Sequence, residues 1–178
     1  MVLFAEENHT DLITGLRIPI TNRLWTISCG EAPRPIFEDP KVCSHEWWDA
    51  DGVHAWSVWG NDTWRSNVQT GELERIEWPV YCLHAHCSVD GRYLVCDSTE
   101  RFYRGCATSV HFMDRQTGKT LKLIDHPAMD NFTGTNYHID PHPLFCCDDR
   151  SVVFTTTVRG RVDVAVVPTE NLVGLTLA

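Results

Sequence analysis

At 178 residues, with 43% apolar and 22% charged residues, the chain is long enough to bury a core and is globular rather than disordered. Its formal net charge of -9 argues against a basic surface for phosphates, so we expect no nucleic-acid partner. No run of 18 apolar residues is present, and the start MVLFAEENHTD lacks the basic and apolar regions of a signal peptide. We therefore expect a cytoplasmic protein with no membrane partner.

Short runs rich in β-branched and aromatic residues follow one another along the chain, separated by turn pairs such as Asp-Gly and Thr-Gly. No window of 12 residues shows the apolar period of a helix, apart from a short turn expected near Asn171. An all-β chain is therefore predicted, opening with a strand at residues 2–6. The other predicted strands include Leu24 to Ile27, His54 to Trp59, Tyr93 to Cys96, Val110 to Met113, Val152 to Thr157 and Val162 to Val167.

A histidine recurs six residues before an aspartate at three places, each time with an apolar run just after. These pairs are His45 and Asp51, His84 and Asp90, and His142 and Asp148. Each copy is typical of a strand, a tight turn and a second strand. The three histidines are therefore predicted to occupy equivalent positions in three structural repeats.

The spacing of the repeats distinguishes between β architectures. The step is 39 residues from His45 to His84 and 58 from His84 to His142, and the similar segments QTGELERI and QTGKTLKLI begin 47 residues apart. Units of this length with four short antiparallel strands are typical of β-propeller blades. We predict about three to four blades over residues 1–178, forming one partial β-propeller domain that is the C-terminal portion of a longer propeller. The longer step indicates an inserted loop, which we place at Asp125 to Tyr137.

The first strand of each propeller blade lines the central channel, so His45, His84 and His142 are expected to converge there. Imidazole is a common metal ligand, and His138 and Asp140 lie on the same short segment as His142. His86 shares a strand face with His84, because strand side chains alternate with period two. The pattern therefore predicts a metal site and leaves open which of these two neighbouring histidines is a ligand.

Other conspicuous residues have structural explanations as well. His54 and His111 are interpreted as ordinary blade residues and His126 as a loop residue. The eight cysteines include no CxxC pair and suit reduced buried thiols, which are typical of the cytoplasm. The tryptophans near Trp47 could stack on sugar rings, although packing between blades explains them more simply. Arg17 and Arg23 are each either a surface arginine or a cation that reaches the axis and neutralises a carboxylate.

Three ordered segments together resemble the oligogalacturonate lyase family. They are HEWWDADG, HAHCSVDGRYLVCDS and HIDPHPLF, the last followed by VVFTTTVRGRVDVAVV. The family's elements have the forms HE-aromatic-W-x-x-DG, HxHxxxDGxxxVxD and HPxFxxDGxxVxFT. TolB-like propellers share the PxFxxDGxxVxF element but lack the histidine series. The resemblance spans most of the chain.

The resemblance implies a seven-bladed propeller that cleaves digalacturonate by β-elimination, with a divalent cation, typically manganese. His45 then corresponds to the catalytic base and Arg23 to the catalytic arginine. The implied metal ligands are His142 and one of His84 and His86. Arg17 and Trp47 are candidates for substrate binding, and a dimer is one expected assembly.

The last motif departs from the family, which often has a Gln and two closely spaced histidines there. This chain instead has Tyr137, His138, Asp140 and His142. Either His138 and Asp140 replace the missing ligands, or the site and its substrate differ; a carboxylate ligand would still suit manganese or magnesium. The alternative from another class is a noncatalytic propeller segment that serves as an interaction platform.

Overall fold

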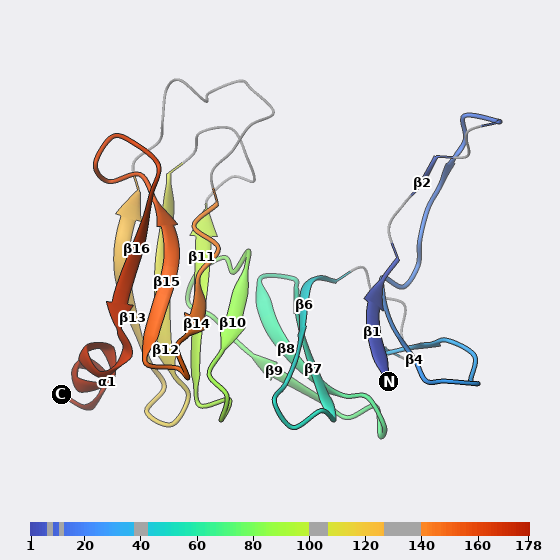
Figure 1. Cartoon of the computed structure of the whole chain (residues 1–178), viewed down its shortest axis with the longest axis horizontal. Helices are drawn as coiled ribbons and strands as arrows, with labels where there is room; N and C mark the ends of the chain where they lie inside the picture. The colour runs from blue at the N-terminus through green and yellow to red at the C-terminus, as the bar shows by residue number, and fades with distance from the viewer. Residues whose placement is uncertain (7–8, 11–12, 38–42, 100–106, 127–139) are drawn as a thin grey trace. The chain divides into compact units, whose positions relative to one another are not determined.

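The computed structural model describes residues 1–6, 9–10, 13–37, 43–99, 107–126 and 140–178. Its backbone contacts divide the chain into two compact units, Met1–Ile76 and Glu77–Ala178, which are described separately. Antiparallel sheets make up most of both units (Figure 1). Within the described residues, no helix has the length and apolar character needed to cross a lipid bilayer.

The first unit contains a four-stranded meander in the order β6-β7-β8-β9, a three-stranded sheet in the order β1-β4-β5, and the short pair β2-β3. Leu24, Phe37, Cys43 and Ala55 are buried together between the three-stranded sheet and the meander. The strands are β1 (Val2–Ala5), β2 (His9–Thr10), β3 (Arg17–Ile18), β4 (Leu24–Ile27), β5 (Arg34–Pro35), β6 (Ser44–Trp48), β7 (His54–Trp59), β8 (Asp62–Asn67) and β9 (Leu73–Ile76).

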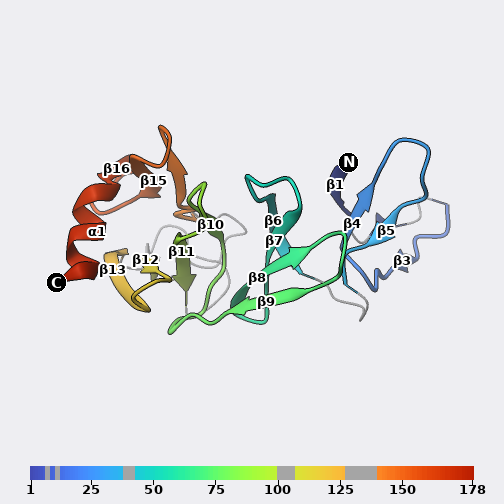
Figure 2. The same cartoon turned by 90° about the horizontal axis from the view of Figure 1, so that it is seen from below.

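The second unit contains a second four-stranded meander, β10-β11-β12-β13, and the three-stranded sheet β14-β15-β16. The helix α1 follows β16 and packs against β12, β13 and β16 (Figures 1 and 2). The elements are β10 (Ala85–Cys87), β11 (Tyr93–Thr99), β12 (Thr108–Asp114), β13 (Lys119–His126), β14 (Leu144–Cys146), β15 (Ser151–Thr156), β16 (Asp163–Pro168) and α1 (Thr169–Leu177).

The core of the second unit lies between its two sheets. Val95, Val110 and Phe112 come from the four-stranded sheet, and they pack with Phe145 and Phe154 of the three-stranded sheet. All five side chains are buried. Because side chains alternate between the two faces of a strand, these residues of β11, β12 and β15 lie on the faces that the two sheets turn toward each other. Burial of this face is what holds two successive sheets of the unit together.

Most of the sequence-based predictions of secondary structure are confirmed. The predicted strands at Leu24 and His54 have the observed bounds, and the other five, including the opening strand at residues 2–6, differ from the observed strands by one to three residues at one or both ends. The turn expected near Asn171 is the nine-residue helix α1. The interpretation of His126 as a loop residue is wrong, because it is buried at the end of β13. Asp125 also belongs to β13, and most of the predicted inserted loop lies outside the described residues.

Candidate metal centre

The histidine repeat corresponds to three equivalent strand pairs. β6 pairs with β7, β10 with β11, and β14 with β15, each in antiparallel register. In the first two pairs the Asp-Gly turn places Gly52 and Gly91 at positive φ, a conformation that glycine adopts without steric cost. The prediction of strand, tight turn and strand is therefore confirmed for all three copies.

His45 lies on a β-bulge at the start of its strand pair. Ser44 is opposite Val58 and Trp47 is opposite Trp56, so that His45 and its neighbour together face a single residue of β7. The backbone of His45 has a φ of 54°, in the left-handed region that non-glycine residues seldom occupy. A bulge of this kind redirects the side chain of the bulged residue and is frequent next to functional sites. Since His45 belongs to the first unit, its convergence with the other two histidines stays a prediction.

His84 is held by a buried carboxylate in the second unit. Its ring Nδ1 lies 2.9 Å from Oδ2 and 3.0 Å from Oδ1 of Asp97, and its backbone N–H donates to Oδ1 over 2.8 Å. A carboxylate can only accept hydrogen bonds, so Nδ1 carries the proton and Nε2 carries the lone pair. Histidines that ligate metals through one nitrogen commonly donate the other N–H to a carboxylate in this way.

His142 lies next to His84 and is ordered by the same carboxylate. The backbone N–H of His142 donates to Oδ2 of Asp97 over 2.8 Å. The two imidazole rings are stacked with their centroids 4.2 Å apart, and each offers a ring nitrogen within 4.8 Å of the other. Like His45, His142 has a left-handed backbone, with a φ of 46°. Two of the three equivalent histidines therefore share a conformation that costs about 1–3 kcal/mol and is typical of functional positions.

The protonation state of His142 suits a ligand. Partial desolvation, and then the neighbouring ring of His84, lowers the pKa of His142 below its ordinary value, which favours the neutral ring. A metal requires an unprotonated imidazole nitrogen. Oδ2 of Asp140 lies 3.9 Å from Nε2 of His84, which adds a carboxylate beside the two rings. His138 lies outside the described residues, so its role as a ligand stays a prediction.

His86 has a different environment from His84. Its Nδ1 accepts a hydrogen bond of 3.3 Å from the backbone N–H of Phe145, which places the proton of the neutral ring on Nε2. Burial lowers the pKa of His86, so the neutral form is favoured. A ring with both nitrogens committed in this way cannot also coordinate a metal without rearrangement. Of the two alternatives that the sequence leaves open, the geometry therefore favours His84.

The remaining predicted site residues lie in the first unit. Arg23 pairs with the carboxylate of Glu46 and donates to the carbonyl oxygen of Cys43 over 3.4 Å, which holds its guanidinium beside the strand that carries His45. Arg17 is exposed on β3. Trp47 stacks on Trp56, its partner across β6 and β7, with the ring centroids 5.7 Å apart and the planes 1° from parallel. This aromatic packing lies within one sheet, whereas packing between blades was expected.

A second group of potential ligands consists of Asp49, Asp51 and His54, whose ligand atoms lie within 4.8 Å of one another. Hydrogen bonds already engage these carboxylates. Oδ2 of Asp49 accepts from Trp56 and from Arg65, and Asp51 binds His54 and Arg65. Desolvation raises the pKa of Asp51, but hydrogen bonds from the turn outweigh this effect and lower it to about 2. We interpret the group as the network that closes the turn between β6 and β7.

Asp97 is the residue of this centre that sequence reasoning missed. It lies in β11, is 1% exposed, and its carboxylate binds His84 and His142, which are 58 residues apart in the chain. The signal was present, because Asp97 ends the segment HAHCSVDGRYLVCD that carries the second histidine. An acidic residue that directly follows an apolar run within a strand is seldom buried without a hydrogen-bonding partner, because burying an unpaired charge is costly, and this is a reason to search for such a partner.

Comparison with known proteins identifies the architecture. No protein-family model matches the chain, and no curated protein does either. Among solved structures, an oligogalacturonate lyase in complex with manganese and one from Vibrio parahaemolyticus each have a TM-score of 0.64, at 21% and 22% sequence identity. The similarity to each of them covers 93% of this chain. It covers 44% of the first lyase and 45% of the second. TolB from Acinetobacter baumannii also has a TM-score of 0.64, at 15% identity. This similarity covers 95% of this chain and 39% of the TolB chain.

The chain thus spans less than half the length of these structures. At these identities the likeness concerns the fold, which the lyases share with TolB. In three of the sheets the strands follow one another in chain order and pair with their sequence neighbours, as in the blades of such a fold. The chain is therefore an all-β protein with the architecture of a partial β-propeller.

Proposed function

We propose that the chain belongs to a propeller of the oligogalacturonate lyase type, which cleaves oligogalacturonides such as digalacturonate by metal-dependent β-elimination in pectin degradation. The observation that carries this proposal is the pair of stacked imidazoles, His84 and His142, ordered by one buried carboxylate. The likeness to a lyase solved with manganese supports it. The described cysteines lie outside any disulfide, which supports the cytoplasm as the compartment.

The donor set suits a first-row divalent cation, with manganese as the proposed one. His84, His142 and Asp140 would hold it, and imidazole nitrogen with carboxylate oxygen is a donor combination that such ions accept. Asp97 would keep the ring of His84 in the tautomer that binds. When bound, the cation would neutralise the carboxylate of the uronate and so acidify the proton on C5.

The residues of the first unit would carry the proton transfer. In this proposal His45 removes the C5 proton, and the bond between C4 and the glycosidic oxygen then breaks to leave an unsaturated uronate. Arg23 would stabilise the negative charge that develops on the substrate. Its ion pair with Glu46, the residue after His45, holds the guanidinium beside β6, the strand that carries His45. Arg17 and Trp47 stay candidates for substrate binding.

The proposal is tested by the reaction itself. Purified protein, shown to be folded by circular dichroism, is incubated with manganese and digalacturonate, and the ultraviolet absorbance of the unsaturated product is followed. We expect absorbance to rise with manganese, to stay flat with a chelator, and to fall at least about 100-fold in rate for His45→Gln, which removes the base. Folded, manganese-bound protein that forms no product would exclude the lyase.

One observation favours the second candidate, a noncatalytic interaction platform. Val164 and Val166 project from the same face of β16 and are 69% and 62% exposed, although valine is usually buried. Exposed apolar patches commonly mark protein interfaces. A folded protein that binds no manganese, forms no product and self-associates or binds another protein through Val164 and Val166 would support this alternative. Dimerisation of the chain likewise stays a prediction.

A further inference from the structure

The four-stranded sheet of the second unit has two faces. Both carry buried apolar side chains, which on the second face are Leu94, Cys96 and Met113, but the second face also carries a group of polar residues. One face carries Val95, Val110 and Phe112 into the core. On the other, residues from three adjacent strands form two polar rows. Ser98 of β11 is opposite Ser109 of β12, which is opposite Asp125 of β13, and His111 of β12 is opposite Lys122 of β13. We call these five residues the polar ladder.

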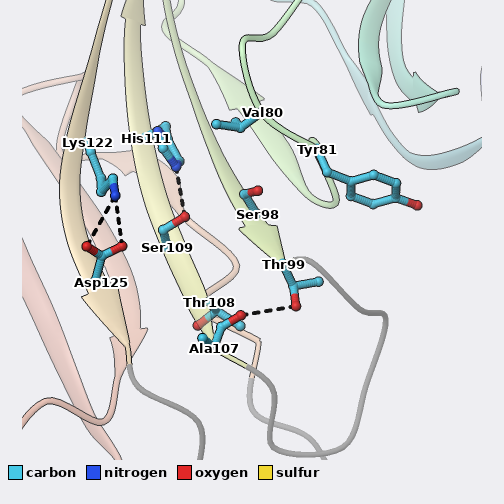
Figure 3. A pocket seen from close by; sticks show the side chains of 10 residues that line it. All are labelled: Val80, Tyr81, Ser98, Thr99, Ala107, Thr108, Ser109, His111, Lys122 and Asp125. Atoms are coloured by element: carbon cyan, nitrogen blue, oxygen red, sulfur yellow. Dashed lines mark hydrogen bonds and ion pairs between the residues drawn. The ribbon is translucent and has the colours of Figure 1, made fainter.

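The polar ladder forms one wall of a pocket with a volume of about 350 Å³ (Figure 3). Val80 and Tyr81 line it from the segment before β10, while Thr99 and Thr108 line its end. In Figure 3 the side chain of Val80 points toward His111, whereas the ring of Tyr81 points away from the sheet. A few hundred cubic ångströms is the lower end of the size of small-molecule sites. Apolar atoms make up the larger part of the surface that lines this pocket, and the polar ladder supplies hydrogen-bonding groups along one wall.

The groups of the ladder are connected in two pairs. Ser109 Oγ lies 2.8 Å from Nε2 of His111, and Nζ of Lys122 lies 3.2 Å from each carboxylate oxygen of Asp125. Burial, followed by the nearby ammonium of Lys122, lowers the pKa of His111, so its ring is neutral near pH 7. The charges of the ion pair cancel. The ladder therefore offers hydroxyl, imidazole, ammonium and carboxylate groups with no net charge.

This combination selects a class of ligand. An apolar molecule would exclude water from these groups without satisfying the hydrogen-bonding capacity that their mutual pairs leave unused, which is costly. An anion or a cation would face an ion pair that offers it no net attraction. A neutral molecule with several hydroxyl groups can donate to the carboxylate and accept from the ammonium at once, and its further hydroxyls can reach the serines.

We propose that this pocket binds a small neutral polyhydroxylated ligand of monosaccharide size, through Ser98, Ser109 and the Lys122–Asp125 ion pair. The site lies on β11, β12 and β13, on residues other than those of the candidate metal centre. It requires neither a metal nor lyase activity. A finding that the pocket binds no such ligand would therefore not count against the proposed lyase function. A finding that the protein is no lyase would likewise not count against the pocket.

The test uses isotope-labelled, metal-free protein in the presence of a chelator, so that the candidate metal centre contributes nothing. D-glucose and D-galactose are titrated separately, and backbone amide shifts are followed by nuclear magnetic resonance. We expect saturable shifts in β11, β12 and β13 for at least one hexose, with a Kd of about 1–10 mM, since a ligand of this size gains only a few tenths of a kcal/mol per atom. Cyclohexanol, with one hydroxyl, and glucuronate, an anion, are expected to bind at least about tenfold more weakly.

Matched variants locate the site. Lys122→Met and Asp125→Asn are expected to weaken hexose binding at least about tenfold, because each removes a charged hydrogen-bonding partner. Both side chains are more than half exposed, so the fold should tolerate the changes. Lys119→Met alters another exposed lysine of β13 that does not line the pocket, and it should leave the affinity within about twofold. The proposal is overturned by an absence of saturable shifts in these strands, by binding that Lys122→Met and Asp125→Asn leave intact, or by a preference for glucuronate.

Discussion

Asp97 binds His84 at two points, through the protonated Nδ1 of the ring at 2.9 Å and through the backbone N–H at 2.8 Å. The carboxylate is almost completely buried and also accepts the backbone N–H of His142. One side chain of β11 thus orders two candidate ligands that come from different strand pairs. A substitution that removes this carboxylate should therefore change the positions of both histidines.

Asp97→Asn should weaken manganese binding about 10–100-fold, because the amide offers one acceptor oxygen where the carboxylate offers two. The free energy of unfolding should fall by about 1–3 kcal/mol, since a buried N–H group loses its partner. Calorimetric titration with manganese and urea unfolding measure the two effects. Asp163→Asn, which changes a half-buried aspartate of β16 paired with the exposed Arg161, is the matched control and should alter neither much. Unchanged metal affinity in Asp97→Asn would contradict the assignment of His84.

His84→Ala and His86→Ala should differ sharply in manganese affinity. The first variant removes a ring whose Nε2 carries the lone pair, while the second removes a ring whose Nδ1 accepts from Phe145. We expect at least about a 100-fold loss for His84→Ala and less than about fivefold for His86→Ala. Electron paramagnetic resonance of unbound manganese gives both values. Equal losses would show that both histidines are ligands.

Replacing His142 tests whether its left-handed backbone is strained. His142→Gly should be more stable than His142→Ala by about 1 kcal/mol, because glycine adopts positive φ without the steric cost that Cβ imposes. Both variants remove the same ring, so the difference isolates the backbone. His45 should behave in the same way, since its φ is 54°.

The control for this prediction is His54, which lies in the regular strand β7. There His54→Gly should be less stable than His54→Ala, because glycine is the more flexible residue in the unfolded chain. Urea unfolding of the six variants measures all three differences. The same sign at His54 as at His142 would mean that the left-handed backbone carries no strain.

His126 should make stability depend on pH. Burial lowers the pKa of His126 in the folded protein, while its ring binds Thr108 at 3.2 Å and Thr156 at 2.8 Å. Because the folded pKa lies below the value of about 6.5 in the unfolded chain, the unfolded state takes up the proton first. The stabilising contribution is therefore complete above about pH 6.5 and is lost as the pH falls from there through the folded pKa.

Unfolding by urea from pH 7.5 to pH 5 measures this dependence. The free energy of unfolding should fall with pH, with a slope from His126 of at most about 1.4 kcal/mol per pH unit. His126→Gln, which keeps a polar side chain but does not titrate, should fall less steeply than the wild type. Parallel curves for the two proteins would show that His126 does not contribute.

The sequence predicted the strands well because β-branched and aromatic runs between turn pairs are local signals. β4 and β7 have the expected bounds, and the strand pairs of the histidine repeat are all present. His126 was misplaced because its neighbours resemble a loop, whereas it pairs with Thr108 at the end of β13. The helix α1 was underestimated because only a few of its residues are buried, so its apolar period is weak.

By itself the sequence determined the all-β character of the chain, the blade-like repeat and the equivalence of His45, His84 and His142, because spacing along the chain expresses all three. Only the tertiary structure distinguished the hydrogen bonds of His84 from those of His86, and only it showed that Asp97 binds both His84 and His142. Those distinctions depend on which nitrogen carries a proton and on which carboxylate reaches it. Hydrogen bonds between residues 13 to 59 positions apart set both, and no local pattern contains them.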